Sequence, residues 1–107
     1  MYIQNIHHMF IKNRDPDVVR AQEEELRSTA ILDSFVKNIL TQIDRHRPFA
    51  NNVGSVEKLF MNFISAIRAM KRLIDAETTT KYETLATELR TLWETKQREV
   101  RQIEEDA

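Results

Sequence analysis

The sequence contains no cysteine, one glycine and two prolines among its 107 residues. Without cysteine, the chain has no disulfide bond, no thiol nucleophile and no zinc–thiolate site. Turns consume glycine and proline, so their scarcity predicts few turns and therefore few, long elements. No apolar run approaches the roughly 18 residues that a membrane-spanning helix needs. Residues 1–14 lack the apolar stretch and cleavage site of a secretory signal, so we expect a cytoplasmic location.

The residues that are present favour helices. Hydrophobic residues make up 41% of the chain and charged residues 31%, which allows a core and argues against compositional disorder. The net charge of −1 argues against a dedicated polyanion binder. Apolar residues recur at helical spacing, and the alternation typical of strands is absent. The chain is also too short for two domains, so we predict one all-α domain.

The predicted fold is an antiparallel bundle of three long helices with a short amphipathic helix before them. Residues 1–14 are predicted to form a docking segment, and residues 15–107 a single helical-bundle domain. The three long helices are predicted at about 16–46, 55–77 and 80–105.

Capping residues indicate where these helices begin and end. Asp15 followed by Pro16 is typical of a helix start. The first long helix should end before Pro48, because the residue that precedes proline is pushed out of the helical region. Ser55 is the predicted N-cap of the second helix, and a capping box that starts at Thr80 is predicted for the third.

The first long helix is apolar on one face only from Ile31 to Ile43, and the same face is polar earlier, at Glu24 and Glu25. The helix therefore either extends beyond the bundle or breaks near Ser28. We favour one continuous helix, because no proline or glycine marks a break. In a hairpin around residue 50, position i faces roughly position 100 minus i. That register would bring Glu24, Glu25 and Arg27 close to Lys71, Arg72 and Asp75.

The histidines and acidic residues do not form a catalytic or metal-binding pattern. His7 and His8 are adjacent, so on a helix they point about 100° apart and cannot share a metal ion. His46 precedes the loop, and we expect it to neutralise the negative end of the first long helix. No phosphate-binding loop fits a chain with one glycine. We expect no enzymatic activity, no cofactor, no metal and no small-molecule substrate.

Basic residues support an alternative function, that of a nucleic-acid-associated regulator. They fall into two small clusters separated by acidic residues, which makes a poor phosphate track. The clusters are Arg45, Arg47 and Lys58, and Arg68, Lys71 and Arg72.

Our preferred hypothesis is a non-catalytic protein-interaction module that associates with itself, docks a partner's helix, or does both. Three surfaces carry the candidate residues. A helix as short as residues 1–14 is marginal in water, so it must dock on its own bundle, on a second chain, on a partner or on a membrane surface. Threonine is a mediocre helix former, so a threonine row on the third helix is a candidate contact face. The candidate residues are Tyr2, Ile3, Ile6, Met9 and Phe10; Glu24 and Glu25; and Thr84, Thr87, Thr91 and Thr95.

Overall fold

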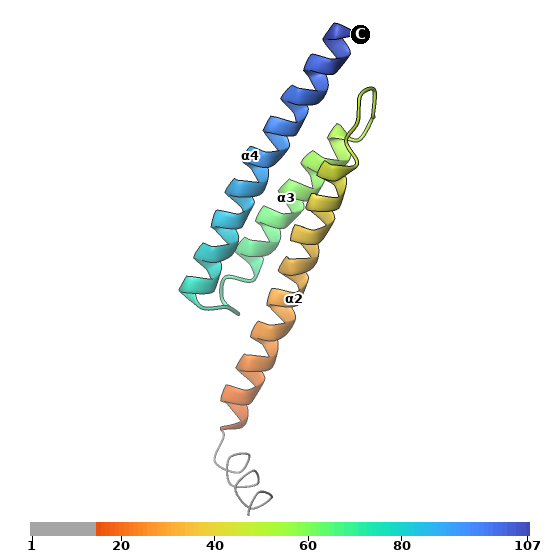
Figure 1. The fold of residues 1–107 in the computed structure, drawn as a ribbon. Coiled ribbons are helices and arrows are strands. Elements are labelled where there is room, and N and C mark those ends of the chain that lie inside the picture. Colours follow the sequence, from red (N-terminus) through yellow and green to blue (C-terminus); the bar gives the residue numbers. More distant parts are fainter. Residues whose placement is uncertain (1–14) are drawn as a thin grey trace, which may run out of the picture.

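The computed structural model describes residues 15–107, and within that range the chain forms three helices and no strand. The helices are α2 (Pro16–Asp44), α3 (Val53–Ala69) and α4 (Ala76–Asp106). Helices α2 and α4 run in the same direction and α3 runs opposite to both (Figure 1). Each helix contacts the other two, which confirms the predicted all-α bundle of three helices. The predicted N-terminal helix and its residues Tyr2, Ile3, Ile6, Met9 and Phe10 lie outside the described residues.

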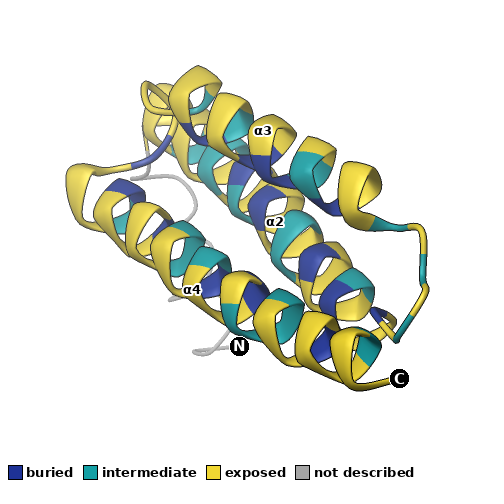
Figure 2. Cartoon of the chain, turned by 90° about the horizontal axis from the view of Figure 1, so that it is seen from above, coloured by how far each residue is buried: buried dark blue, intermediate teal, exposed yellow. Residues whose placement is uncertain are grey.

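The core lies where the three helices face one another (Figure 2). Burial of each large apolar side chain stabilises the fold by roughly 1.5–3 kcal/mol. The rings of Phe35 on α2 and Phe63 on α3 stack with their centroids 5.8 Å apart, which is close to the predicted pairing of position i with roughly position 100 minus i. The buried apolar cluster comprises Leu32, Ile39, Ile43, Val56, Phe60, Phe63, Ile67, Ile74, Tyr82, Leu89 and Trp93.

Helix α2 is continuous and extends beyond the bundle at its N-terminal end. The Asp15 carboxylate accepts from the N–H of Asp17 at 2.9 Å, and Pro16 is the first helical residue, so the predicted start is confirmed. The helix passes through Ser28 without a break, and the buried Ser28 hydroxyl donates to the carbonyl of Glu24 at 2.7 Å. Residues 16–27, which we call the α2 extension, project beyond the ends of α3 and α4 (Figure 1).

The second helix begins two positions earlier than Ser55, the predicted N-cap. It starts at Val53, and Asn52 is its cap residue, although the Asn52 side chain does not bind the helix backbone. Instead, the Asn52 amide nitrogen donates to the carbonyl of Gln42 at 3.0 Å. The prediction of Ser55 is wrong because Asn52 is held in place by its contacts with α2.

The connection between α3 and α4 also differs from the prediction. Helix α3 ends at Ala69 and α4 begins at Ala76, so the predicted limits at 77 and 80 are wrong. The intervening turn places Ile74 in the core with 7% exposure. Asp75 is the true cap, since its carboxylate accepts from the N–H of Thr78 at 2.7 Å. Thr80 lies inside α4 and donates to the carbonyl of Ala76.

Candidate interaction surface between helices α2 and α4

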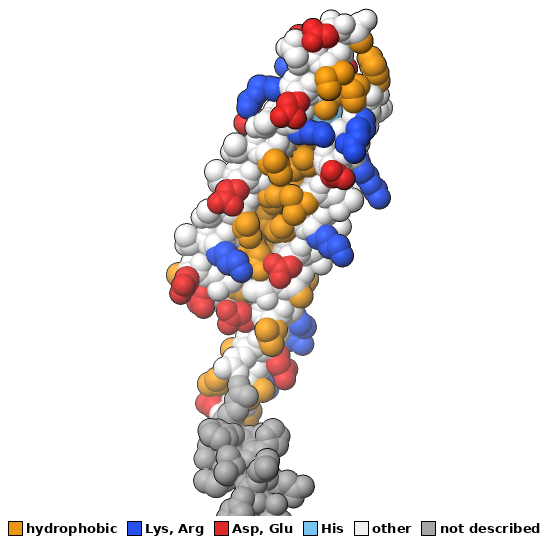
Figure 3. Space-filling model, viewed as in Figure 1, with side chains coloured by type: hydrophobic (Ala, Val, Ile, Leu, Met, Phe, Trp, Pro, Cys, Tyr) orange, Lys and Arg blue, Asp and Glu red, His pale blue; other side chains and the backbone are white. Residues whose placement is uncertain are grey.

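Two leucines remain about half exposed on neighbouring helices. Leu40 of α2 is 43% exposed and Leu92 of α4 is 47% exposed. They line the same open groove, which has a volume of about 300 Å³. Hydrophobic side chains gather in the strip between α4 and α2, with charged side chains on both sides (Figure 3). We call this strip the α2–α4 groove, and its lining is Leu40, Ile43, Asp44, Leu92, Thr95, Lys96 and Glu99.

Helical geometry explains why these leucines stay exposed. On α2, Ile39 and Ile43 point into the core, and Leu40 is rotated by about 100° from Ile39. On α4, Leu89 and Trp93 are buried, while Leu92 follows the side of the helix that faces α2. Three helices cover only the inner part of each apolar stripe, so Leu40 and Leu92 lie at the edge of the core and remain partly exposed.

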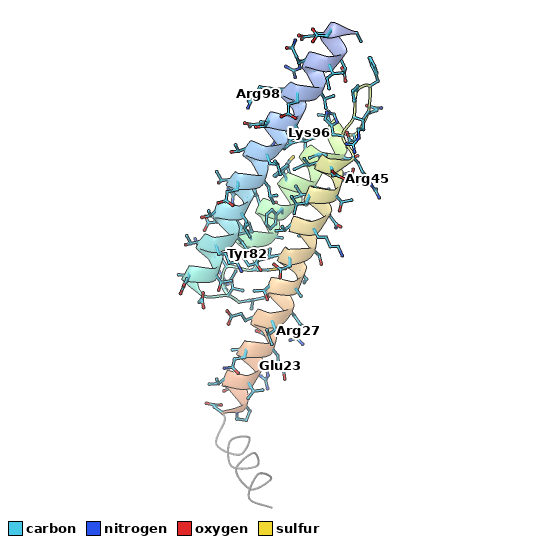
Figure 4. The ribbon with its side chains drawn as sticks, in the orientation of Figure 1. Glu23, Arg27, Arg45, Tyr82, Lys96 and Arg98 are labelled. Carbon is cyan, nitrogen blue, oxygen red and sulfur yellow. The ribbon has the colours of Figure 1, made fainter. Side chains whose placement is uncertain are left out.

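A hydrogen bond between helices aligns the two walls of the groove. The Tyr82 hydroxyl of α4 donates to the Asp33 carboxylate of α2 at 2.6 Å, and it lies 3.5 Å from the carbonyl of Thr29. Burial and the Asp33 carboxylate raise the pKa of Tyr82 to about 12. Tyr82 marks the end of the bundle where the α2 extension begins (Figure 4).

A second polar network ties α4 to α3. Glu57 accepts two hydrogen bonds from Arg90, at 2.7 and 2.9 Å, and one from the indole N–H of Trp93 at 2.9 Å. The Arg90 guanidinium also lies 4.2 Å from the centroid of the Phe60 ring. The hydrogen bonds from Arg90 lower the pKa of Glu57, and the bond from Trp93 lowers it further. These contacts hold α4 against α3, while Leu92, about 100° around the helix from Trp93, lines the α2–α4 groove.

His46 has a structural position that the sequence did not suggest. Its side chain is buried at 4% exposure, with the ring edge against Trp93 at a centroid distance of 4.9 Å. Because the Asn52 nitrogen donates to Gln42, the Asn52 oxygen faces His46 and accepts from its Nδ1–H at 2.7 Å. The negative end of α2 is instead contacted by Arg47, whose guanidinium donates to the carbonyl of Asp44. The predicted role of His46 therefore belongs to Arg47.

The predicted threonine row is divided between two surfaces. Thr95 lines the α2–α4 groove, whereas Thr87 lines another cavity, between α3 and α4. The hydroxyls of Thr87, Thr91 and Thr95 each donate to the backbone carbonyl four residues earlier. Thr84 is exposed on the same side of the helix. The hydroxyl protons of those three residues are therefore used within α4.

The acidic residues of the first long helix do not meet the basic residues that the register suggested. Glu24 and Glu25 lie on the α2 extension, where the side chains of Glu23 and Arg27 also project (Figure 4). Among residues 15–107, no ion pair joins Glu24 or Glu25 to Lys71 or Arg72. Helix α3 ends at Ala69, so its basic end does not continue alongside the extension.

The basic residues of the alternative hypothesis are spread over the loop that follows α2, helix α3 and the turn that follows α3. Arg68 and Lys71 line the cavity between α3 and α4 together with Glu83, so an acidic side chain accompanies them. Lys58 borders a different cavity, between α2 and α3. The nucleic-acid hypothesis stays a prediction.

Within residues 15–107, no His, Cys, Asp or Glu side chains group in a way that could hold a metal ion. No helix in that range is sufficiently long and apolar to cross a membrane. No protein-family model matches this chain, and neither curated proteins nor solved structures give a match to it.

The sequence did not single out Leu40 and Leu92, because both fit the apolar stripes of their helices. Their exposure in one groove marks the surface where a partner could bind. No periodicity could have separated them from the buried positions on the same stripes.

Proposed function

We propose that this protein is a non-catalytic protein-interaction module that docks an amphipathic helical surface in the α2–α4 groove. The observation that carries the proposal is the exposure of Leu40 and Leu92 side by side in one open groove. Helix-in-groove recognition uses apolar anchors that repeat at helical spacing and a polar rim that sets orientation.

The groove has both of these features. Leu40 and Leu92 supply the apolar floor, and Asp44, Lys96 and Glu99 supply a rim of both charges. Fully burying a leucine contributes roughly 1.5–3 kcal/mol, so covering the exposed half of each would contribute about 1 kcal/mol. Such an interface is modest and depends on its rim for specificity, as expected for reversible association.

The test is photo-cross-linking in cells from side chains placed inside and outside the groove. Leu92 is replaced by p-benzoylphenylalanine in one variant, and Met61 is replaced in the matched control. Met61 is 67% exposed on α3, so both positions present an accessible apolar side chain. We expect protein adducts from position 92 and few from position 61.

A second pair of variants shows whether the leucines themselves carry the contact. In the variant that carries p-benzoylphenylalanine at position 92, the added substitution Leu40→Glu should abolish the adducts. A carboxylate in the groove would have to lose its water when the partner covers it. Met61→Glu should leave the adducts unchanged. Circular dichroism checks that both variants keep their helix content. Equal adducts from positions 61 and 92, or none from either, would contradict the proposal.

A further inference from the structure

We propose that the partner in the α2–α4 groove is a second copy of this chain, packed antiparallel across a twofold axis beside Leu40 and Leu92. The inference rests on the proposed function, since it names the occupant of the same groove.

The two leucines line one groove between helices that run side by side in the same direction (Figure 1). Tyr82 bonds to Asp33 toward one end of these helices, and Leu92 and Leu40 meet roughly 10–15 Å farther along, from the rise per residue. We place a twofold axis in the plane of the interface, at right angles to both helices, so that it passes over Leu92 of α4 and Leu40 of α2. It would place Leu92 against its own copy, and likewise Leu40.

Charges on α4 are arranged with opposite sign on the two sides of Leu92. Glu88 lies four residues before it and Lys96 four residues after it. The twofold axis therefore places Glu88 of each copy opposite Lys96 of the other, which gives two opposite-charge pairs. Lys96 projects from α4 beside the groove, on the face that the second copy would cover (Figure 4).

Helix α2 shows the same self-complementarity with the signs reversed. Lys37 precedes Leu40 by three residues and Asp44 follows it by four. The same axis brings Lys37 of each copy close to Asp44 of the other. Among residues 15–107, none of Lys37, Asp44, Glu88 and Lys96 forms an ion pair within the chain, so all four charges are available. An isologous dimer needs a surface of this kind, in which each charge meets its opposite when the surface is rotated onto itself.

Charge at the two ends of α2 favours the antiparallel over the parallel arrangement. The stretch from Asp15 to Asp33 holds six acidic residues against two basic ones, whereas Arg45 and Arg47 follow the other end of α2. Antiparallel packing points the acidic half of each α2 toward the basic end of the other. Parallel packing would place the two acidic α2 extensions at the same end, where they would repel each other. It would also align the dipoles of all four packed helices.

The dimer is tested first by its mass as a function of concentration. Sedimentation equilibrium of the full chain should show a monomer–dimer equilibrium. Glu88→Lys alone and Lys96→Glu alone should each weaken the dimer about tenfold or more, because like charges then oppose across the axis. Met61→Glu serves as the matched charge change outside the surface and should have no effect.

Two rescue experiments identify the antiparallel geometry. An equimolar mixture of E88K and K96E should dimerise as strongly as the unmodified chain, because each reversed charge then meets its opposite. The double variant E88K/K96E should also recover the dimer. In the parallel arrangement, positions 88 and 96 would instead face Lys37 and Asp44, so neither the mixture nor the double variant would recover.

The natural absence of cysteine allows a covalent test. Leu92→Cys should form a disulfide-linked dimer on mild oxidation, because the two copies of position 92 meet at the axis, and M61C should not. A monomer at all concentrations with position 92 still cross-linked to a different protein would overturn the dimer and leave the proposed function intact. A monomer without any adduct from position 92 would overturn both. A dimer that is indifferent to the charge reversals would overturn this geometry.

Discussion

The hydroxyl of Tyr82 donates to the carboxylate of Asp33 across 2.6 Å and joins the start of α4 to the middle of α2. Tyr82 is buried at 2% exposure, while Asp33 lies at the surface. The bond joins the same two helices that carry Leu40 and Leu92 farther along, so it supports their alignment together with the buried apolar cluster.

Tyr82→Phe should lower the free energy of unfolding by about 1 kcal/mol, the usual net contribution of one hydrogen bond. The loss is modest because the Asp33 carboxylate can be hydrated in the variant. Urea unfolding followed by the fluorescence of Trp93, the single tryptophan, measures this difference. Asp33→Asn is the companion variant, since its amide oxygen can still accept from Tyr82. A larger loss for D33N than for Y82F would contradict this account.

The same residue predicts a loss of stability at high pH. The pKa of Tyr82 is raised to about 12 in the folded chain from 10.0, so the unfolded chain releases this proton first. Stability is therefore complete below about pH 10 and falls as the pH rises toward 12, by about 2 kcal/mol for a shift of this size. Unfolding measured from pH 9 to pH 12 should show a steeper decline for the unmodified chain than for Y82F. Parallel curves would show that Tyr82 does not carry the effect.

Replacing the Glu57 carboxylate by an amide should cost less stability than truncating the side chain to a methyl group. Glu57→Ala leaves the indole N–H of the fully buried Trp93 without an acceptor, which costs about 1–3 kcal/mol. Glu57→Gln keeps an acceptor oxygen and loses only the charge interaction with Arg90. That interaction is worth less than about 1 kcal/mol, because both side chains are partly exposed. Chemical denaturation of both variants tests the order, and equal losses would contradict it.

Acid should weaken the Glu57 network. Because the hydrogen bonds from Arg90 lower the pKa of Glu57, the unfolded chain binds this proton first as the pH falls. The contribution of Glu57 is present above its usual pKa of 4.5 and is lost as the pH falls through the lowered value. The difference in stability between the unmodified chain and E57Q should therefore shrink below pH 4.5. A constant difference down to pH 2 would contradict this assignment.

Asp75, rather than Thr80, should control the start of α4. Asp75→Ala removes the acceptor for the N–H of Thr78 and should lower the Tm. The pKa of Asp75 is lowered by the same N–H, so the stabilisation should fade as acid protonates the carboxylate. Thr80→Ala should leave the Tm unchanged or raise it, because alanine is the better residue inside a helix. A larger loss for T80A than for D75A would restore the predicted capping box.

Phe49 has a backbone conformation that suits glycine. Its φ is 68°, its side chain is 75% exposed, and its N–H donates to the carboxylate of Glu104 at 2.8 Å. Phe49→Gly should raise the free energy of unfolding by about 0.5–1 kcal/mol, because glycine adopts positive φ without steric cost. Thermal unfolding measures the change, and Phe49→Ala is the control that removes the ring and keeps the strain. Equal stability of the two variants would contradict the strain argument.

The helices and their register were predictable to different degrees from the sequence. The start of α2 was predicted correctly because Asp15 and Pro16 offer one cap and one first residue. The start of α4 was not, because Asp75 and three consecutive threonines all favour a cap, and periodicity alone does not choose among them. The stacking of Phe35 on Phe63 agrees with the rough register expected from the position of the single clear loop.

The sequence by itself determined that this protein consists of long helices, where α2 begins, and around which loop α2 and α3 pair. Periodicity, caps and turn residues are local properties, so they are readable without a fold. Only the tertiary structure decided that Leu40 and Leu92 remain exposed, that Asn52 orients His46, and that Tyr82 reaches Asp33. Three helices cover each apolar stripe incompletely, and which residues stay at the rim depends on how the helices are rotated against one another.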